Sequence, residues 1–332
     1  MEKILTISIA AYNIENYIDK LMESLIDSER MDEIEILVVD DGSKDKTNEI
    51  ACKYSKKYPE TVRVITKENG GHGSTINTGI KNASGKYFKA IDGDDWVESE
   101  SLKQIIPLLY ELDDEMVICD YNKCFSDGRV VVEKFDNIES MKSYSFDDLT
   151  KKVKWMCYHT IIYKTSILKD NNIRLDEKCF YVDSEYDLFP IPFVNSVFYF
   201  GKSLYCYRLG DTEQSVSPES RMKNIKNGYT VAKRLVQMCK TQIEGLPESK
   251  SNYILYGAAD QCIWHIKSLL IFPVSLRKMK EIKKFDKAIK NNDLRVYKMM
   301  EKQGKESRVI NMFRKTFYLT YYPLAIYKKI KK

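Results

Sequence analysis

The feature that most constrains the fold is a regular alternation of short apolar runs with helical patterns near the N-terminus. Four runs rich in aliphatic residues are separated by segments in which apolar residues recur every three or four positions. The runs are residues 4–11, 34–39, 62–65 and 87–91. Strands that alternate with helices in this way favour a mostly parallel sheet with helices on both faces. We therefore expect an α/β fold.

The net charge of +5 conceals two parts of opposite charge. Residues 221–332 carry 26 Lys and Arg against 8 Asp and Glu, whereas the first 220 residues carry 27 against 40. From about residue 220 the pattern changes to long helices, which we expect at 220–243, 250–271, 276–290, 292–302 and 307–330. We predict an α/β domain over 1–215 and a basic, all-α domain over 216–332. Its charge would attract an anionic surface.

Several classes of protein have no support in the sequence. The eight cysteines form no Cys-x-x-Cys pair and the three histidines lie far apart, which excludes the usual zinc and redox motifs. Neither a signal peptide nor an uninterrupted apolar window of about 18 residues is visible. We expect a cytoplasmic protein with free thiols. No nucleic-acid-reading module is recognisable, so we expect no nucleic-acid partner.

The C-terminal stretch mixes apolar and basic residues. Apolar Met312, Phe313 and Phe317 stand among Arg314, Lys315 and the terminal lysines. An amphipathic basic helix of this kind can lie on an anionic membrane leaflet, and it can equally pack on its own domain with solvated lysines. Peripheral contact with the inner face of the cell membrane is therefore one of two readings.

Polar clusters follow each of the four predicted strands. They are Tyr12-Asn13, Asp40-Asp41, residues 69–73 and residues 92–95. In open α/β sheets, ligands bind outside the carboxyl ends of the strands. We therefore expect the four clusters to form one shared site.

The last cluster, Asp92-Gly93-Asp94-Asp95, places three carboxylates within four residues. Like charges this close repel one another and raise one another's pKa. A hard divalent cation would offset the repulsion, because Mg²⁺ favours carboxylates together with substrate phosphate oxygens. An acidic surface loop is the alternative reading.

The glycine-rich stretch after the third strand fits no standard phosphate motif. A P-loop would need Gly-Lys-Ser/Thr, which is absent, and a dinucleotide fingerprint would need glycine where Ile76 stands. Gly71 and Gly73 still allow a close approach of the backbone, and the helix that follows directs its amides toward an anion. A purely structural turn is equally compatible.

Taken in order, these motifs resemble family 2 glycosyltransferases with the GT-A, Rossmann-like fold. The resemblance covers residues 3–110 well and 155–210 more loosely. It rests on Ala11-Tyr12-Asn13, Val39-Asp40-Asp41-Gly42-Ser43, Asn69-Gly70-Gly71, Asn77 and Asp92-Gly93-Asp94-Asp95. The resemblance implies an inverting, divalent-metal-dependent enzyme. It would move a hexosyl or N-acetylhexosaminyl group from a nucleotide-diphosphate donor, most often a UDP-sugar, to a hydroxyl of a glycan or lipid-linked acceptor in cell-surface polysaccharide synthesis.

The resemblance also implies roles for single residues. Tyr12 would lie against the nucleobase, Asp40 would accept a hydrogen bond from it, and Asp92 would reach the ribose or the metal. Asp94 would ligate the metal, Mn²⁺ or Mg²⁺, together with Asp92. The whole predicted donor-binding set is Ala11, Tyr12, Asn13, Asp40, Asp41, Gly71, Asn77, Asp92, Gly93 and Asp94.

The catalytic base is expected at Asp183. Inversion by direct displacement needs a carboxylate that removes the proton of the acceptor hydroxyl, and the family places it in a Glu-Asp pair that opens a downstream helix. Here Val182 stands where that Glu would be. Glu185 and Asp187 are rival candidates, and acids at a helix N-terminus are also favoured for structural reasons.

Other departures from the family affect the phosphate contacts. Ala10-Ala11 stands where the family often has Pro, and Ile76 stands where it often has Arg, so phosphate contacts would fall to His72 or to backbone amides. His159 opens a segment near the expected acceptor cleft and is either a site residue or a structural one.

Two other functions remain open from the sequence. A sugar-nucleotide nucleotidyltransferase would share the sheet and the metal, but its Gly-rich, Arg/Lys-bearing N-terminal loop is absent. A non-catalytic protein that binds nucleotide sugars or glycans is the second alternative.

Overall fold

The computed structural model describes residues 2–26, 30–210, 215–273, 275–305 and 307–321. The chain divides into two compact units, Met1–Gly210 and Asp211–Lys332. The roles that we predict for the two parts stay predictions. None of the described helices is both long and apolar enough to cross a membrane.

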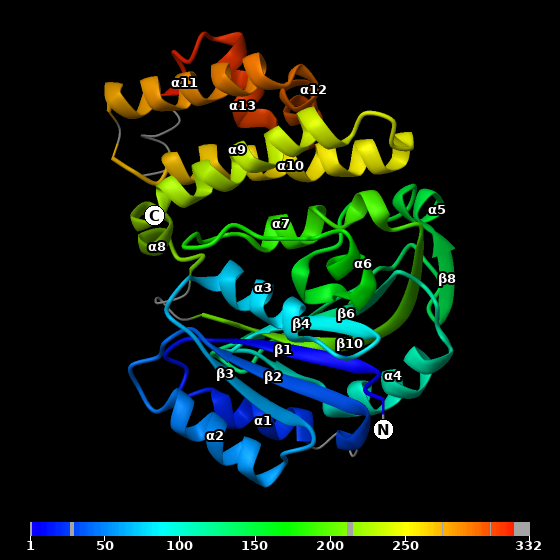
Figure 1. The fold of residues 1–332 in the computed structure, drawn as a ribbon. Coiled ribbons are helices and arrows are strands. Elements are labelled where there is room, and N and C mark those ends of the chain that lie inside the picture. The colour runs from blue at the N-terminus through cyan, green and yellow to red at the C-terminus, as the bar shows by residue number, and fades with distance from the viewer. Residues whose placement is uncertain (1, 27–29, 211–214, 274, 306, 322–332) are drawn as a thin grey trace. The chain divides into compact units, whose positions relative to one another are not determined.

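Within its described residues, the first unit is built on one ten-stranded sheet in the order β3-β2-β1-β4-β9-β6-β10-β5 (Figure 1). β7 pairs with β6, and β8 pairs with β10. The strands are β1 (Leu5–Ala11), β2 (Ile34–Asp40), β3 (Val62–Thr66), β4 (Tyr87–Asp92), β5 (Trp96–Val97), β6 (Met116–Phe125), β7 (Val130–Glu133), β8 (Lys142–Ser145), β9 (Ile161–Lys164) and β10 (Ser196–Leu209).

The four strands predicted from the apolar runs are parallel to one another. β1 pairs with both β2 and β4, and β2 pairs with β3. The second half of the sheet is mixed, because β9 runs antiparallel to β4 and β6 whereas β10 runs parallel to β6. The prediction of an α/β fold with a largely parallel sheet is confirmed.

Helices cover both faces of this sheet. α1, α2 and α4 lie on one face, and α3 and α6 lie on the other (Figure 1). Apolar residues at helical spacing explain the packing of α1, which buries Ile18, Leu21, Met22 and Leu25. The helices of the unit are α1 (Ile18–Ile26), α2 (Thr47–Lys57), α3 (His72–Asn82), α4 (Ser99–Glu111), α5 (Phe146–Thr150), α6 (Thr165–Asp170) and α7 (Asp183–Leu188), with short 3₁₀ turns η1 (Met31–Glu33), η2 (Tyr158–Thr160) and η3 (Ile191–Phe193).

Two local expectations differ from the structure. The apolar runs at 197–200 and 204–208 predict two strands, but the structure has a single strand, β10, whose register against β6 shifts around Gly201 (φ +74°). Glycine tolerates this left-handed conformation, so the strand bends there without ending. The sequence of residues 126–146 is rich in turn formers and predicts one strand, at 129–133. The structure contains that strand as β7 and has β8 there in addition.

The second unit is helical in its described residues, as predicted. Its helices are α8 (Pro218–Lys223), α9 (Ile225–Gln242), α10 (Glu248–Leu269), α11 (Leu276–Asn292), α12 (Leu294–Met299), η4 (Met300–Lys302) and α13 (Ser307–Lys315). The predicted helix 220–243 is two helices that meet at Asn224. α13 ends at Lys315, short of the predicted residue 330, and residues 322–330 lie outside the described residues.

Candidate active site

The carboxyl ends of the parallel strands bring the predicted clusters to one edge of the sheet. The strand register places Ala11 beside Asp40 and Ala10 beside Asp92. Asp40 in turn lies beside Thr66, the last residue of β3. The polar residues that follow these strands therefore start from the same edge.

The Tyr12-Asn13 turn is fastened to the turn after β2. Asn13 has a left-handed backbone (φ +52°), its side-chain oxygen accepts from the Lys44 amide at 2.8 Å, and its own amide donates to Ser43 Oγ at 3.0 Å. This turn leaves the Tyr12 ring 48% exposed. Asp40 lies beneath the turn and accepts from the Ser43 amide at 3.0 Å. An exposed ring after the end of β1 and a buried carboxylate at the end of the neighbouring strand β2 would suit a nucleobase, and this contact stays a prediction.

Asp41 holds the glycine turn in place. Its Oδ1 accepts from Lys67 Nζ at 2.7 Å and from the Gly70 amide at 2.9 Å, and its Oδ2 accepts from the Gly71 amide at 2.8 Å. Gly71 has φ +81°, which glycine tolerates and which sends the chain directly into α3. The side chain of Asp41 thus has a structural task, and a direct contact with the donor is not needed to explain it.

Asn77 and Gly93 also have structural tasks. The amide group of Asn77 donates to the Leu175 carbonyl and accepts from the Leu175 amide, both at 2.9 Å, which ties α3 to the segment before α7. A Cβ on Gly93 would lie 2.5 Å from Ile14 Cδ1 and 2.8 Å from the Ala10 carbonyl, so only glycine fits there. Donor contacts of either residue stay predictions.

The acidic turn distributes its three carboxylates between different partners. Asp94 Oδ2 pairs with Arg208 Nη2 at 2.6 Å, and Asp95 accepts from Tyr205 Oη at 2.6 Å and from the Arg208 amide at 2.8 Å. Burial and the charge of Asp92 raise the pKa of Asp94, although Arg208 opposes this. Burial and the charges of Asp92 and Asp94 raise the pKa of Asp95 well above its ordinary value. The turn therefore carries more negative charge than its partners neutralise.

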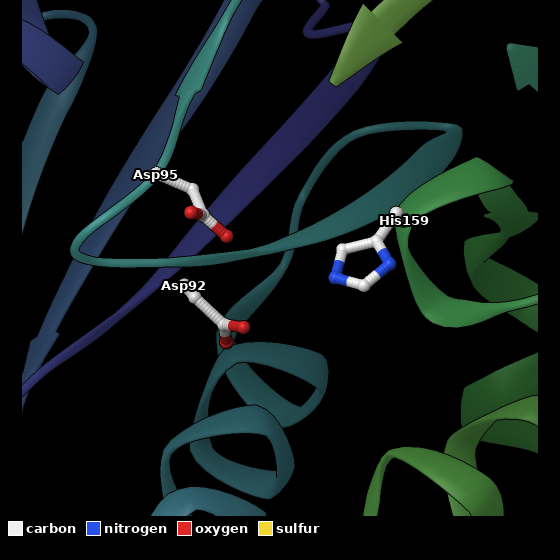
Figure 2. Close-up of side chains that lie close together, drawn as sticks. All are labelled: Asp92, Asp95 and His159. Carbon is white, nitrogen blue, oxygen red and sulfur yellow. The ribbon is translucent and has the colours of Figure 1, made fainter. Parts of the chain in front are cut away.

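A candidate cation site lies at this turn. Figure 2 shows the side chains of Asp92, Asp95 and His159 pointing toward one another, and one ligand atom of each lies within 4.8 Å of the others. Two carboxylates and an imidazole are donors that suit Mn²⁺ or Mg²⁺. The structure groups Asp92 with Asp95 and His159, whereas the predicted second ligand, Asp94, is paired with Arg208.

His159 is packed between tyrosines. Its ring stacks on Tyr121 and Tyr207 with centroid distances of 5.1 and 4.3 Å. Burial lowers the pKa of His159 to about 4, so the imidazole is neutral near pH 7. A neutral imidazole is the form that ligates metals. His159 therefore lies close to Asp92 and Asp95 in a form that can ligate a metal, and its role as a site residue stays a prediction.

His72, the first residue of α3, bridges the predicted metal carboxylate and the predicted base. Its Nε2 lies 2.9 Å from Asp92 Oδ1 and its Nδ1 lies 3.2 Å from Asp183 Oδ1. The Nε2 approach is a charge contact rather than an aligned hydrogen bond. Burial alone would lower the pKa of His72, but the two carboxylates outweigh burial and hold this pKa well above its ordinary value. The three side chains form one connected charge network.

The environment of α7 separates Asp183 from its rivals. The Asp183 side chain is 50% exposed. Glu185 and Asp187 are buried, and Glu185 Oε2 accepts from the Asp176 amide at 2.7 Å. Burial, together with the charge of Asp183, raises the pKa of Asp187 well above its ordinary value. Of the three candidates, Asp183 is the one that an acceptor can approach.

Sequence reasoning missed Lys89, which lies within β4 and is 1% exposed. Its Nζ donates to the carbonyls of Tyr158, His159 and Ile161 at 3.0, 2.7 and 3.0 Å. It therefore fixes the η2 turn that carries Tyr158 and His159. The sequence feature that could have indicated its role is its position as the single lysine inside the apolar run 87–91. Arg208 was missed too, although it ends a predicted strand.

Comparisons with known proteins identify the family. The family model described as Glycosyl transferase family 2 matches residues 6–171. A relative named uncharacterized glycosyltransferase EpsJ, from Bacillus subtilis (strain 168), is 30% identical over 217 residues, which are 63% of this chain and 62% of that protein. Poly(ribitol-phosphate) beta-N-acetylglucosaminyltransferase TarS of Staphylococcus aureus is 29% identical over 174 residues, which are 52% of this chain and 30% of TarS. The chain thus spans less than two thirds of these relatives.

Solved structures show the same fold. The crystal structure of S. aureus TarS 1–349 in complex with UDP-GlcNAc matches with a TM-score of 0.65 at 22% identity, over 94% of this chain and 92% of that one. The mannosyltransferase PcManGT from Pyrobaculum calidifontis, in complex with GDP-Man and Mn²⁺, matches with a TM-score of 0.54 at 13% identity, over 95% and 88% of the two chains. This chain therefore belongs to glycosyltransferase family 2, and it has the GT-A fold.

Proposed function

We propose that the protein is a metal-dependent, inverting glycosyltransferase that moves a sugar from a UDP-sugar to a hydroxyl of a growing surface glycan. The observation that carries this proposal is the network of Asp92, His72 and Asp183. It places the carboxylate of the acidic turn and the exposed carboxylate of α7 on either side of one imidazole. A donor-binding group and a proton acceptor are thus close enough to serve one reaction.

The proposed donor is a uridine diphosphate sugar. The exposed ring of Tyr12 would stack on the base, while Asp40 would accept a hydrogen bond from it. The complex of S. aureus TarS with UDP-GlcNAc supports this choice, because that protein has the same fold. An N-acetylhexosaminyl donor is therefore the first to test.

Asp92, with Asp95 and His159, would hold the divalent cation, and Asp94 would join them if Arg208 turned away. The cation would supply charge neutralisation for the departing diphosphate. The protein's own contribution is to orient these carboxylates, through Tyr205 on Asp95 and Tyr158 on Asp92. Arg208, 2.6 Å from Asp94, is a second positive group for the diphosphate.

Asp183 would act as the base. In the proposed step the acceptor oxygen forms a bond to the anomeric carbon while the bond from that carbon to the diphosphate breaks. Asp183 takes the proton of the acceptor hydroxyl, and the anomeric centre inverts. The charge contact with His72 holds the Asp183 carboxylate toward the donor edge of the sheet.

The proposed acceptor is a glycan on a lipid carrier at the cytoplasmic face of the membrane. Two relatives support a surface polymer by their names, TarS and the minor teichoic acid biosynthesis protein GgaB of Bacillus subtilis. GgaB is 30% identical over 170 residues, which are only 19% of its length. The acceptor class thus rests on partial matches and on the basic second unit.

A donor screen tests this function. We expect one UDP-sugar, UDP-GlcNAc first, to raise the melting temperature in the presence of Mn²⁺ and to release UDP slowly with water as acceptor. A chelator should remove both effects. The variant Asp92→Asn should lose them as well, whereas Asp136→Asn, on an exposed loop, should retain them. The proposal would be contradicted if no nucleotide sugar raised the melting temperature, or if the increase persisted in the presence of the chelator.

A further inference from the structure

The segment after α13 has a strained backbone that exposes two large apolar side chains. Phe317 and Tyr318 have φ values of +50° and +68°. Consecutive left-handed residues other than glycine are costly and persist only where the surroundings enforce them. The result is that Phe317 is 78% exposed and Leu319 is 74% exposed, while Tyr318 between them is 9% exposed.

A buried ion pair holds this turn against α11. Arg314 Nη2 lies 2.6 Å from Asp286 Oδ1, and its Nε lies 3.1 Å from Asp286 Oδ2. The Tyr318 hydroxyl donates to the same carboxylate. The Arg314 guanidinium also lies 3.5 Å from the centre of the Tyr297 ring. This network fixes Tyr318 inward, so Phe317 and Leu319 must face outward.

A row of lysines on α11 passes beside the turn. Its members are exposed and follow one another at spacings of three, four and three residues: Lys280, Lys283, Lys287 and Lys290. This spacing puts them on one side of the helix, and Lys283 Nζ lies 5.9 Å from the centre of the Tyr318 ring. The opposite side of α11 buries Ile282, Phe285 and Ile289. Among the described residues none of the four lysines forms an ion pair.

We propose that this surface, the lysine row of α11 together with Phe317 and Leu319, docks the second unit on an anionic lipid leaflet. Cations alone would suit any polyanion. Two outward apolar side chains beside the cations suit a lipid surface, because they can enter the acyl boundary while the lysines remain among the headgroups. The inference depends only on the second unit and is independent of the chemistry proposed for the first.

Vesicle binding by the full chain tests the proposal. The chain is sedimented with vesicles of phosphatidylcholine alone and with vesicles that contain phosphatidylglycerol in equal part. We expect binding to the anionic vesicles only, and weaker binding at higher salt. The double variant Lys283→Gln/Lys287→Gln should bind at least about tenfold more weakly, since each surface cation adds to the attraction. The double variant Phe317→Ser/Leu319→Ser should lose binding by a similar factor.

A matched control is Lys56→Gln/Lys57→Gln, which removes the same charge from exposed positions on α2 and should bind like the parent chain. All variants should keep the far-UV circular dichroism spectrum and the melting temperature of the parent chain, which shows that they are folded. Equal binding to both kinds of vesicle, or variants that bind like the control, would overturn the proposal. Binding of soluble polyphosphate as tight as that of vesicles, with no effect of Phe317→Ser/Leu319→Ser, would also overturn it and assign the surface to a polyanion.

Discussion

The aspartates near this edge of the sheet differ in their surroundings, and their hydrogen-bond partners indicate which of them are structural. Asp41 is 2% exposed, and its carboxylate oxygens accept hydrogen bonds from Lys67 and from two backbone amides. Asp183 is half exposed and contacts His72. The motifs identified which stretches meet at the edge. They did not separate exposed carboxylates from those with structural partners, because the partners of Asp41 lie 26 to 30 residues away and are brought to it only by the fold.

His72 is expected to position the base. We predict that His72→Ala lowers kcat for UDP release by about a hundredfold, since small displacements of a catalytic group have costs of that order. The KM for the donor should change much less. His72→Gln, which can still donate to Asp183, should recover part of kcat. Steady-state kinetics with the donor measure both parameters, and a His72→Ala variant with parental kcat would contradict this role.

His265 in α10 makes the stability of the second unit pH-dependent. It is 3% exposed, and burial lowers its pKa to about 4. Between pH 6.5 and 4 the unfolded chain binds a proton at this residue and the folded chain does not, so stability falls as the pH falls. The expected loss is about 2 kcal/mol at pH 5 relative to pH 7.

The variant His265→Phe removes this titration and keeps an aromatic ring packed against Phe285. In the parent chain the ring centroids of His265 and Phe285 are 4.6 Å apart. Denaturant unfolding at pH 7 and pH 5 should show a smaller loss of stability in the variant than in the parent. The same loss in both chains would mean that His265 does not carry the effect.

At the scale of helices and strands, local patterns predicted the parallel half of the sheet, whereas in the mixed half they predicted strands but not how these strands pair. The runs at 4–11 and 34–39 have enough apolar residues to be recognised as buried strands, and they became β1 and β2. The pairing of β6 with β10 joins Met116 to Val197, 81 positions apart in sequence. No local pattern specifies such a partner. Arg208 and Tyr205, which hold the acidic turn, are placed by that pairing.

Lys89 links β4 to the η2 turn, and its removal should disturb both. In Lys89→Met three buried carbonyls lose their donor, and we expect a loss of about 3 kcal/mol of stability because unpaired buried polar groups are costly. The loss should be accompanied by weaker Mn²⁺ binding, since His159 lies on that turn. Lys81→Met, on an exposed lysine of α3, is the control. Parental melting temperature and metal affinity in Lys89→Met would contradict the link.

At the scale of the whole molecule, charge and chemistry are divided between two units. The acidic first part carries the proposed catalytic groups, and the basic second part carries the proposed lipid-facing surface. Composition alone predicted this division, because charge asymmetry does not depend on the fold. The proposed lipid-facing surface could be recognised only in the structure, because the left-handed backbone at Phe317 and Tyr318 turns the side chains of Phe317 and Leu319 outward.

The central claim is that Asp183 is the base at a donor site built on Asp92. The most direct measurement is the rate of UDP release by Asp183→Asn under saturating donor and Mn²⁺, together with the affinity of that variant for the donor. We predict a rate at least about a hundredfold below that of the parent chain, because a positioned base contributes factors of this size, and an unchanged donor affinity. An Asp183→Asn variant that releases UDP at the parental rate would contradict the account.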